Sequence, residues 1–297
     1  MKIIESIEEM REYSQQCKRK DKTIASVATE SYLHDGHMSL VKIAKENADI
    51  VVISNFHTLW YFQLLDNPEG YTEYITQYCE DILEEDLIIC EKNGVDVCFQ
   101  PNMLDLYSNL TNKITLSSPL VDRFIKESLL TNSKMINGYG DLISLFMLMN
   151  LKVFNIVSPN VCLFGEKDIY DTTSYVKSLI DDLNYSIKFI LAPTIRDVDG
   201  IAISSRNRFL STSQRQDATS IYQTLHEISR WPTYPSILKI KEHITKRITQ
   251  ANGDIHHINI CCLETLKELK LIDRKAVILV AVHFGNSYLS DQIIIEP

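Results

Sequence analysis

Short apolar segments alternate with longer helical patterns over the first two-thirds of the chain, and this alternation limits the possible folds more than any other feature. Five segments have the length and composition of buried strands: Thr23–Val27, Asp49–Asn55, Val95–Gln100, Val161–Phe164 and Ile187–Leu191. Four segments between them have the pattern of helices: Ser39–Asn47, Tyr71–Asn93, Leu142–Ile156 and Tyr170–Asp182. Strands that alternate with helices pair in parallel, so the pattern predicts an α/β fold with a parallel sheet covered by helices on both faces.

The character of the chain changes near Pro193. Residues 212–250 have a mixed polar helical pattern, broken once at Trp231–Pro235. Three segments with strand-like patterns follow: Ile255–Cys262, Ala276–Phe284 and Tyr288–Glu296. We therefore predict two domains, residues 1–190 with the parallel sheet and residues 191–297 as a smaller α+β domain.

The composition excludes several classes of protein. The chain has 297 residues, of which 45% are hydrophobic, and a net charge of −9. The acidic balance argues against nucleic acid as a partner. No apolar run reaches the length of about 18 residues that a membrane helix requires. The first residues, Met1–Glu8, include acidic side chains and no apolar signal core, so we expect a cytoplasmic protein with no membrane partner.

The adjacent histidines His256 and His257 do not have the spacing of metal ligands. They fall in a segment with a strand pattern. Successive side chains of a regular strand point to opposite faces, so we interpret this pair as structural.

A motif of two histidines, His34 and His37, stands between a predicted strand and a predicted helix, with Gly36 in the turn. A helix that begins after a tight turn directs backbone N–H groups and a positive dipole end at its ligand. Residues three apart lie on one face of a helix. The motif predicts a polyphosphate site in which both imidazoles stabilise charge on an attacked phosphate.

Two further clusters carry groups that bind phosphate. One contains Gly165, Lys167 and Asp168, directly after a predicted strand, and the other contains Ser204, Ser205 and Arg206. Glycine permits close approach, lysine and arginine supply charge, and hydroxyls donate hydrogen bonds. Each cluster alone also fits a structural interpretation, such as a helix cap or an exposed ion pair. Three such clusters together favour a site for ATP.

Magnesium accompanies ATP in such chemistry and requires a carboxylate. Asp86, or its neighbour Glu85, is the candidate. The alternative is that this acidic pair belongs to a solvated helix face.

These residues resemble the pantothenate synthetase family, within the HIGH-type nucleotidyltransferases. The matching segments are Leu33–Val41, Asn93–Val97, Lys152–Pro159, Phe164–Asp168, Pro193–Ser211 and Ala276–Ile294. The resemblance implies a Rossmann-like N-terminal domain with a smaller C-terminal lid, and usually a homodimer. It implies an ATP-dependent amide ligase: an acid forms an acyl-adenylate with loss of pyrophosphate, and an amine, β-alanine in the family, then displaces AMP.

Roles are carried over position by position. The implied catalytic residues are His34, His37, Lys167 and Arg206. The implied nucleotide-binding residues are Gly36, Gly165, Asp168, Ile195, Ser204 and Ser205.

The sequence departs from the family at the acid pocket. Glu30, Tyr61 and Asp171 stand where the family has a methionine and two glutamines that line the pantoate pocket. Two added carboxylates beside an anionic acid would be costly unless a cation joined them. We therefore expect an acid other than pantoate, such as an amino acid. The alternatives are a genuine pantothenate synthetase, an inactive nucleotide-binding regulatory protein, and simple adenylyl transfer without amide formation.

Overall fold

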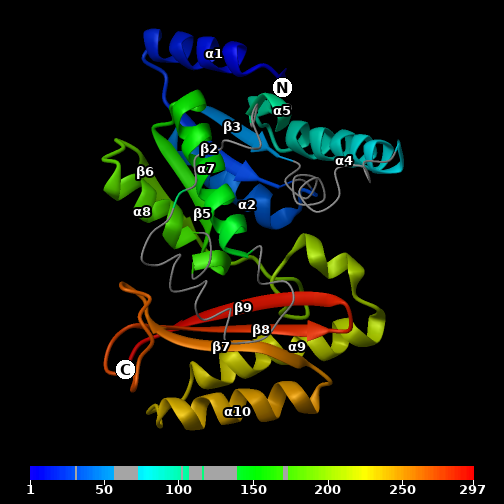
Figure 1. The fold of residues 1–297 in the computed structure, drawn as a ribbon, viewed down its shortest axis with the longest axis vertical. Coiled ribbons are helices and arrows are strands. Elements are labelled where there is room, and N and C mark those ends of the chain that lie inside the picture. Colours follow the sequence, from blue (N-terminus) through cyan, green and yellow to red (C-terminus); the bar gives the residue numbers. More distant parts are fainter. Residues whose placement is uncertain (31, 57–72, 102, 107–115, 117–138, 170–172) are drawn as a thin grey trace. The chain divides into compact units, whose positions relative to one another are not determined.

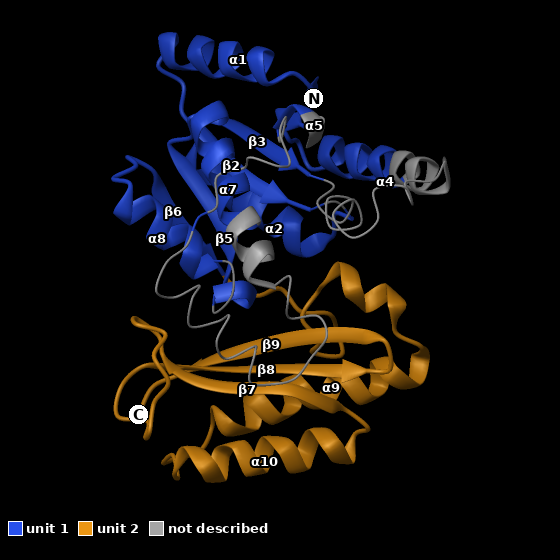
Figure 2. Ribbon diagram, viewed as in Figure 1, with its two compact units in different colours: residues 1–192 blue, residues 193–297 orange. Residues whose placement is uncertain are grey.

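A computed structural model describes the chain except for residues 31, 57–72, 102, 107–115, 117–138 and 170–172. The chain divides into two compact units, Met1–Ala192 and Pro193–Pro297 (Figure 2). The predicted boundary after residue 190 lies two residues before this division.

The first unit contains a six-stranded sheet in the order β1-β4-β3-β2-β5-β6, in which every neighbouring pair is parallel (Figure 1). Its strands are β1 (Lys2–Ile4), β2 (Ile24–Thr29), β3 (Ile50–Asn55), β4 (Val97–Phe99), β5 (Val161–Gly165) and β6 (Lys188–Ala192). Its α-helices are α1 (Ile7–Arg19), α2 (Asp35–Asn47), α4 (Glu73–Lys92), α5 (Met103–Leu106), α7 (Tyr139–Val157) and α8 (Ser174–Asp182). The predicted α/β fold with a parallel sheet is confirmed.

The central strands β2 and β3 are buried along almost their whole length because both faces of the sheet are covered. Ile24 of β2 packs in one hydrophobic cluster, whereas Ala25 and Val27 pack in a second cluster. In β3, Val52 belongs to the first cluster and Val51 to the second. Alternating side chains of one strand thus enter two different cores, as expected for a doubly covered parallel sheet.

The sequence interpretation missed the first strand and helix. β1 has only three residues and pairs with β4 at the edge of the sheet. Helix α1 begins after Ser6, whose side chain accepts a hydrogen bond from the Glu9 N–H at 3.3 Å. This is an N-cap, which satisfies a donor that the first helical turn leaves unpaired.

The second unit contains two helices and an antiparallel sheet in the order β7-β8-β9. Its elements are α9 (Thr212–Ile228), α10 (Ile237–Gln250), β7 (Asp254–Cys262), β8 (Ala276–Phe284) and β9 (Ser287–Ile295). Both helices lie on one face of the sheet (Figure 1). Their buried isoleucines belong to one hydrophobic cluster with residues of the three strands. Among the described residues, no helix combines the length and the apolar composition that crossing a bilayer requires.

A β-bulge corrects the prediction for the adjacent histidines. The pairing of β7 with β8 shifts between Ile255 and His257, so His256 is the extra residue. The His256 and His257 rings therefore meet, with their Nδ1 atoms 2.8 Å apart, instead of pointing to opposite faces. A bulge interrupts the alternation of side chains that a regular strand would show.

Candidate functional site

The strand order of the sheet reverses between β2 and β5, which makes their carboxyl ends its topological switch point. These strands are neighbours, but the chain continues from β2 to β3 on one side and from β5 to β6 on the other. Ligands of open parallel sheets bind at such a switch point, outside the carboxyl ends of the strands. The histidine motif follows β2 and the Gly165–Asp168 cluster follows β5, so both predicted phosphate clusters of this unit lie at that position.

His34 and His37 occupy the start of α2. His34 is the N-cap residue in extended conformation, and its backbone N–H donates to His37 Nδ1 at 3.4 Å. The two rings are stacked, with centroids 4.0 Å apart and an interplanar angle of 19°. Because Nδ1 of His37 accepts this hydrogen bond, its neutral form carries the proton on Nε2, where it can be donated to a ligand.

Both imidazoles are neutral near pH 7. Burial, together with the charge of Lys167, lowers the pKa of His34 to about 4, although Asp35 and Asp168 partly oppose the shift. Burial lowers the pKa of His37 to about 3, with additional repulsion from His34 and Lys167. These two histidines therefore act as hydrogen-bond donors, and the positive charge beside them comes from Lys167.

Lys167 and Asp168 belong to the short 3₁₀ helix Glu166–Asp168 that follows β5. Lys167 Nζ lies 3.4 Å from Asp168 Oδ1, with side-chain exposures of 18% and 47%. The lysine is thus mostly enclosed, whereas its carboxylate partner faces solvent. Among the described residues, the nearest neighbour of a Cβ atom added to Gly165 would be the Lys167 N, at 4.0 Å, so these residues leave space for a ligand beside the glycine.

Asp86 lies inside the first unit and does not face solvent. Its side chain is 2% exposed. Oδ1 accepts a hydrogen bond from the Leu33 N–H at 2.6 Å, and Oδ2 accepts one from Asn55 Nδ2 at 3.1 Å. Asp86 therefore joins the turn before His34 to the end of β3. Glu85, the other carboxylate of the pair, is exposed.

The sequence interpretation noted neither Leu33 nor Asn55 as a partner of Asp86. Asn55 ends β3 at the same edge of the sheet as the two predicted phosphate clusters. This position in the sequence was the one indication that Asn55 belongs to the site. The Asn55 side chain also meets the Thr29 hydroxyl at 3.1 Å, where β2 ends.

In the second unit, a hairpin carries Ile195 at its start. The Ile203 N–H donates to the Ile195 carbonyl at 2.9 Å. Arg196 donates both terminal nitrogens to Asp291 of β9, at 2.6 and 3.0 Å, and its guanidinium lies over the Tyr222 ring at 4.6 Å. The bidentate pair fixes the hairpin to the sheet, and the ring contact fixes it to α9.

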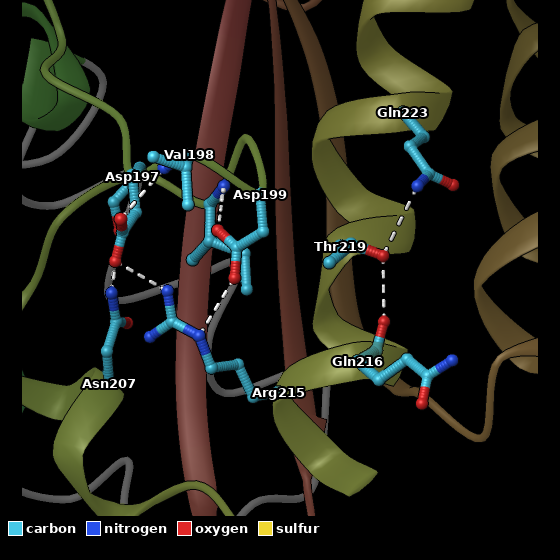
Figure 3. Close-up of polar contacts among 10 residues, drawn as sticks. Asp197, Val198, Asp199, Asn207, Arg215, Gln216, Thr219 and Gln223 are labelled. Carbon is cyan, nitrogen blue, oxygen red and sulfur yellow. Dashed lines mark hydrogen bonds and ion pairs between the residues drawn. The ribbon is translucent and has the colours of Figure 1, made fainter. Parts of the chain in front are cut away.

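A second arginine holds the tip of this hairpin (Figure 3). Arg215, in the first turn of α9, contacts Asp197 at 2.6 Å and Asp199 at 2.8 Å. The backbone turns at Gly200, whose φ is +89° and whose position allows no side chain, because an added Cβ would lie 2.3 Å from the Tyr222 ring. The turn is therefore specified by both conformation and packing.

The hairpin leads directly into Ser204, Ser205 and Arg206. Ser204 caps the 3₁₀ helix Ser205–Phe209 and accepts a hydrogen bond from the Arg206 N–H at 3.3 Å. The Arg206 side chain is exposed. Within the described part of the chain, no carboxylate forms an ion pair with Arg206. Its guanidinium thus keeps its charge and donors for an anionic ligand.

The predicted residues fall into separate groups. The first unit brings together His34, His37 and Lys167 at the switch point; the second places Ile195 and Ser204–Arg206 on one hairpin and the turn that follows it. Of the three predicted acid-pocket residues, Glu30 follows β2 and is exposed. Tyr61 and Asp171 lie outside the described residues.

A parallel sheet with the predicted phosphate clusters at its switch point, followed by a small α+β unit, is typical of α/β nucleotide-binding proteins. Residues 2–294 match the model of the family described as pantoate-beta-alanine ligase. The chain belongs to this family, whose members are ATP-dependent ligases that form a carbon–nitrogen bond and release AMP.

Curated relatives match over the whole length. A pantothenate synthetase from Thermotoga petrophila is 34% identical over 99% of this chain and 100% of its own. One from Coprothermobacter proteolyticus is 31% identical over 100% of this chain and 99% of its own. Both identities are high enough to support the same family assignment.

Solved structures agree in fold. Pantothenate synthetase from Thermus thermophilus superposes with a TM-score of 0.79 at 24% identity, and covers 100% of both chains. Pantoate-beta-alanine ligase from Francisella tularensis, solved as a complex with beta-gamma ATP and beta-alanine, has a TM-score of 0.72 and 26% identity over 99% of this chain and 97% of its own.

Proposed function

We propose that this protein condenses pantoate with β-alanine, using ATP, through a pantoyl-adenylate. The observation that carries the proposal is the neutral pair His34 and His37 beside Lys167, at the switch point of a chain that matches pantothenate synthetases over its whole length.

The chemistry requires stabilisation of charge on phosphorus. The pantoate carboxylate attacks the α-phosphorus of ATP, and the bond to the leaving pyrophosphate breaks. The β-alanine amine then attacks the acyl carbon, loses a proton and displaces AMP. His34 and His37 donate hydrogen bonds to the α-phosphate oxygens, Lys167 supplies charge, and Arg206 holds the outer phosphates. Donors fixed before the reaction stabilise developing charge without reorganisation.

Magnesium fits this site as a companion of the nucleotide. Among the described residues, no group of three or more histidine, cysteine or acidic side chains is arranged to hold a metal. Mg²⁺ is commonly bound through one or two carboxylates together with substrate phosphates. Asp86 is enclosed and already engaged by two donors, whereas Glu85 is exposed. We therefore assign the magnesium carboxylate to Glu85, and to Asp86 the positioning of the turn before His34.

The choice of pantoate differs from the earlier expectation that the acid carries a cationic group, as an amino acid does. That expectation depended on the cost of burying Glu30 and Asp171 beside an anion. Glu30 is exposed, so its carboxylate has no burial penalty that a substrate cation must offset. The whole-length match to pantothenate synthetases then favours pantoate.

Pyrophosphate release with a panel of acids tests the proposal. We expect release with ATP and pantoate, and pantothenate when β-alanine is added. The variant His37→Gln should lower kcat/KM at least about 100-fold, as loss of a donor to a developing oxyanion does. Turnover with amino acids and none with pantoate would establish the alternative substrate. ATP binding without release from any acid would indicate a regulatory protein, and release without an amide product would indicate adenylyl transfer.

Two associated properties complete the proposal: a cytoplasmic location and a homodimer. Fractionation of cells tests the first, and light scattering of the purified protein tests the second. A monomeric mass at micromolar concentration would contradict the homodimer.

A further inference from the structure

Arg206 lies against an aromatic ring from another element of the second unit. Its guanidinium carbon is 5.5 Å from the centroid of the Tyr288 ring, at the start of β9. A guanidinium within about 6 Å of a ring centroid is attracted by the ring's negative face. This contact supplements the hydrogen bond of the Arg206 backbone to Ser204 and acts on the side chain itself.

The Tyr288 ring is itself held in place by two histidines. His283 pairs with Tyr288 across β8 and β9, and their ring centroids are 5.1 Å apart at an interplanar angle of 61°. His256, brought to this side of the sheet by the β-bulge, approaches the ring at 5.5 Å and 85°. Edge-to-face contacts of this kind restrict the orientation of a ring. The Tyr288 ring therefore has a restricted orientation where the Arg206 guanidinium packs on it.

Another arginine of this unit, Arg196, also lies over a tyrosine ring, and the comparison shows what is particular to Arg206. Arg196 lies over Tyr222 at 4.6 Å, but Asp291 neutralises it through two hydrogen bonds. The guanidinium of Arg206 has the ring contact without a carboxylate from the described residues. The donors of Arg196 are thus used within the fold, whereas the planar guanidinium of Arg206 has donors that an anion can accept.

We propose that Tyr288 is a positioning residue, which holds the Arg206 guanidinium in the orientation that receives the phosphate chain of ATP. The inference rests on the proposed function for the identity of the anion. An exposed arginine loses rotamer freedom when it binds phosphate. A ring that restricts the side chain beforehand reduces this loss and so strengthens binding.

The test compares Tyr288→Leu, which removes the ring, with Tyr288→Phe, which keeps it. We expect the Leu variant to raise the Kd for ATP, measured by calorimetry, by about threefold to fivefold. The Phe variant should stay within twofold of the unchanged protein. In steady-state assays the KM for ATP should rise while the KM for pantoate does not, which a general loss of structure would not produce.

A double-mutant cycle assigns the effect to Arg206. In an Arg206→Gln background, Tyr288→Leu should change the Kd for ATP less than twofold. Should the Leu variant fold poorly, Tyr288→Met removes the ring in the same way. A Kd within twofold of the unchanged protein for the Leu or Met variant, or an equal loss in the Gln background, would overturn the inference. Absence of pyrophosphate release from the unchanged protein would refute the proposed function alone, since the Kd measurements still test Tyr288.

Discussion

Asp86 fixes the backbone of Leu33, the residue immediately before the histidine motif. Its Oδ1 accepts the Leu33 N–H at 2.6 Å, and the side chain is 2% exposed. Burial raises the pKa of the Asp86 carboxyl, and the hydrogen bonds from Leu33 and Asn55 oppose this shift. A buried side chain thus anchors the backbone one residue before His34, the N-cap of α2.

Removal of this acceptor should destabilise the protein. Asp86→Ala leaves the Leu33 N–H buried without a partner, and we expect the free energy of unfolding to fall by about 1–3 kcal/mol in urea titrations. Asp86→Asn keeps an acceptor for Leu33 and should lose less. Glu85→Gln, at an exposed position, should leave stability unchanged but raise the magnesium concentration needed for half-maximal activity. If Asp86→Asn raised the magnesium requirement and Glu85→Gln left it unchanged, Asp86 would instead be the magnesium-binding carboxylate.

Acid should weaken the fold through the two motif histidines. Their pKa values in the folded protein, about 4 for His34 and about 3 for His37, lie below the ordinary value of 6.5. As the pH falls below 6.5, the unfolded chain binds these protons first, so stability is complete above that pH and declines toward pH 4. Each histidine contributes up to about 1.4 kcal/mol per pH unit in this window.

The matched measurement is the free energy of unfolding at pH 7 and pH 5.5. The double variant His34→Gln/His37→Gln should lose less stability between these pH values than the unchanged protein. His257, whose pKa burial lowers to about 4, is present in both proteins and cancels in the comparison. Equal losses in the two proteins would show that the motif histidines are not the source.

Gly165 should be required for the nucleotide and not for the fold. Its φ of −79° suits any residue, and among the described residues an added Cβ has no neighbour closer than 4.0 Å. Gly165→Ala should therefore change the free energy of unfolding by less than about 0.5 kcal/mol. The added methyl group occupies space that the phosphates approach, so we expect the Kd for ATP to rise at least about tenfold.

Gly200→Ala is the contrasting control, because it combines a φ of +89° with a clash against Tyr222. It should lower the thermal midpoint in scanning calorimetry by several degrees, as about 1–3 kcal/mol of strain would do. Full ATP affinity in Gly165→Ala would remove that glycine from the nucleotide site.

The two arginine contacts of the hairpin should differ in energy. Arg196 and Asp291 are 22% and 5% exposed, whereas Arg215 and Asp197 are 34% and 44% exposed. Asp291→Ala leaves a mostly buried guanidinium unpaired, and we expect a loss of about 3–5 kcal/mol in denaturant titrations. Asp197→Ala breaks a solvated pair (Figure 3), which should cost about 1 kcal/mol or less. A larger loss for Asp197→Ala would show that the hairpin tip, not its base, holds this segment.

Local patterns were sufficient to predict most of the sheet. β2 and β5 are short buried runs, each with a glycine close to its carboxyl end or in the helix that follows. Their alternation with helical segments along the chain predicted the parallel arrangement. α1 had a readable signal, since its buried residues Met10, Ser14 and Cys17 recur at helical spacing. β1 had none, because a strand of three residues is too short for any periodicity.

The predicted phosphate clusters could be recognised from the sequence, whereas the contacts that support them could not. The histidine motif is contained within four residues, so the sequence could show its geometry at the start of a helix. The contact of Leu33 with Asp86 spans 53 positions, and that of Arg196 with Asp291 spans 95. Pairs so distant are chosen by the tertiary fold, and a single sequence contains no pattern that identifies them.

The β-bulge at His256 has a further consequence for how such a surface can evolve. It places one extra residue in β7 without displacing the pairing of the rest of the strand with β8. Insertion of a single codon at this point can therefore add a side chain beside Tyr288 while every other residue of the strand keeps its face. The deletion of that residue would undo the change just as locally, so chain length, as well as residue identity, becomes a means of adjusting this corner of the protein.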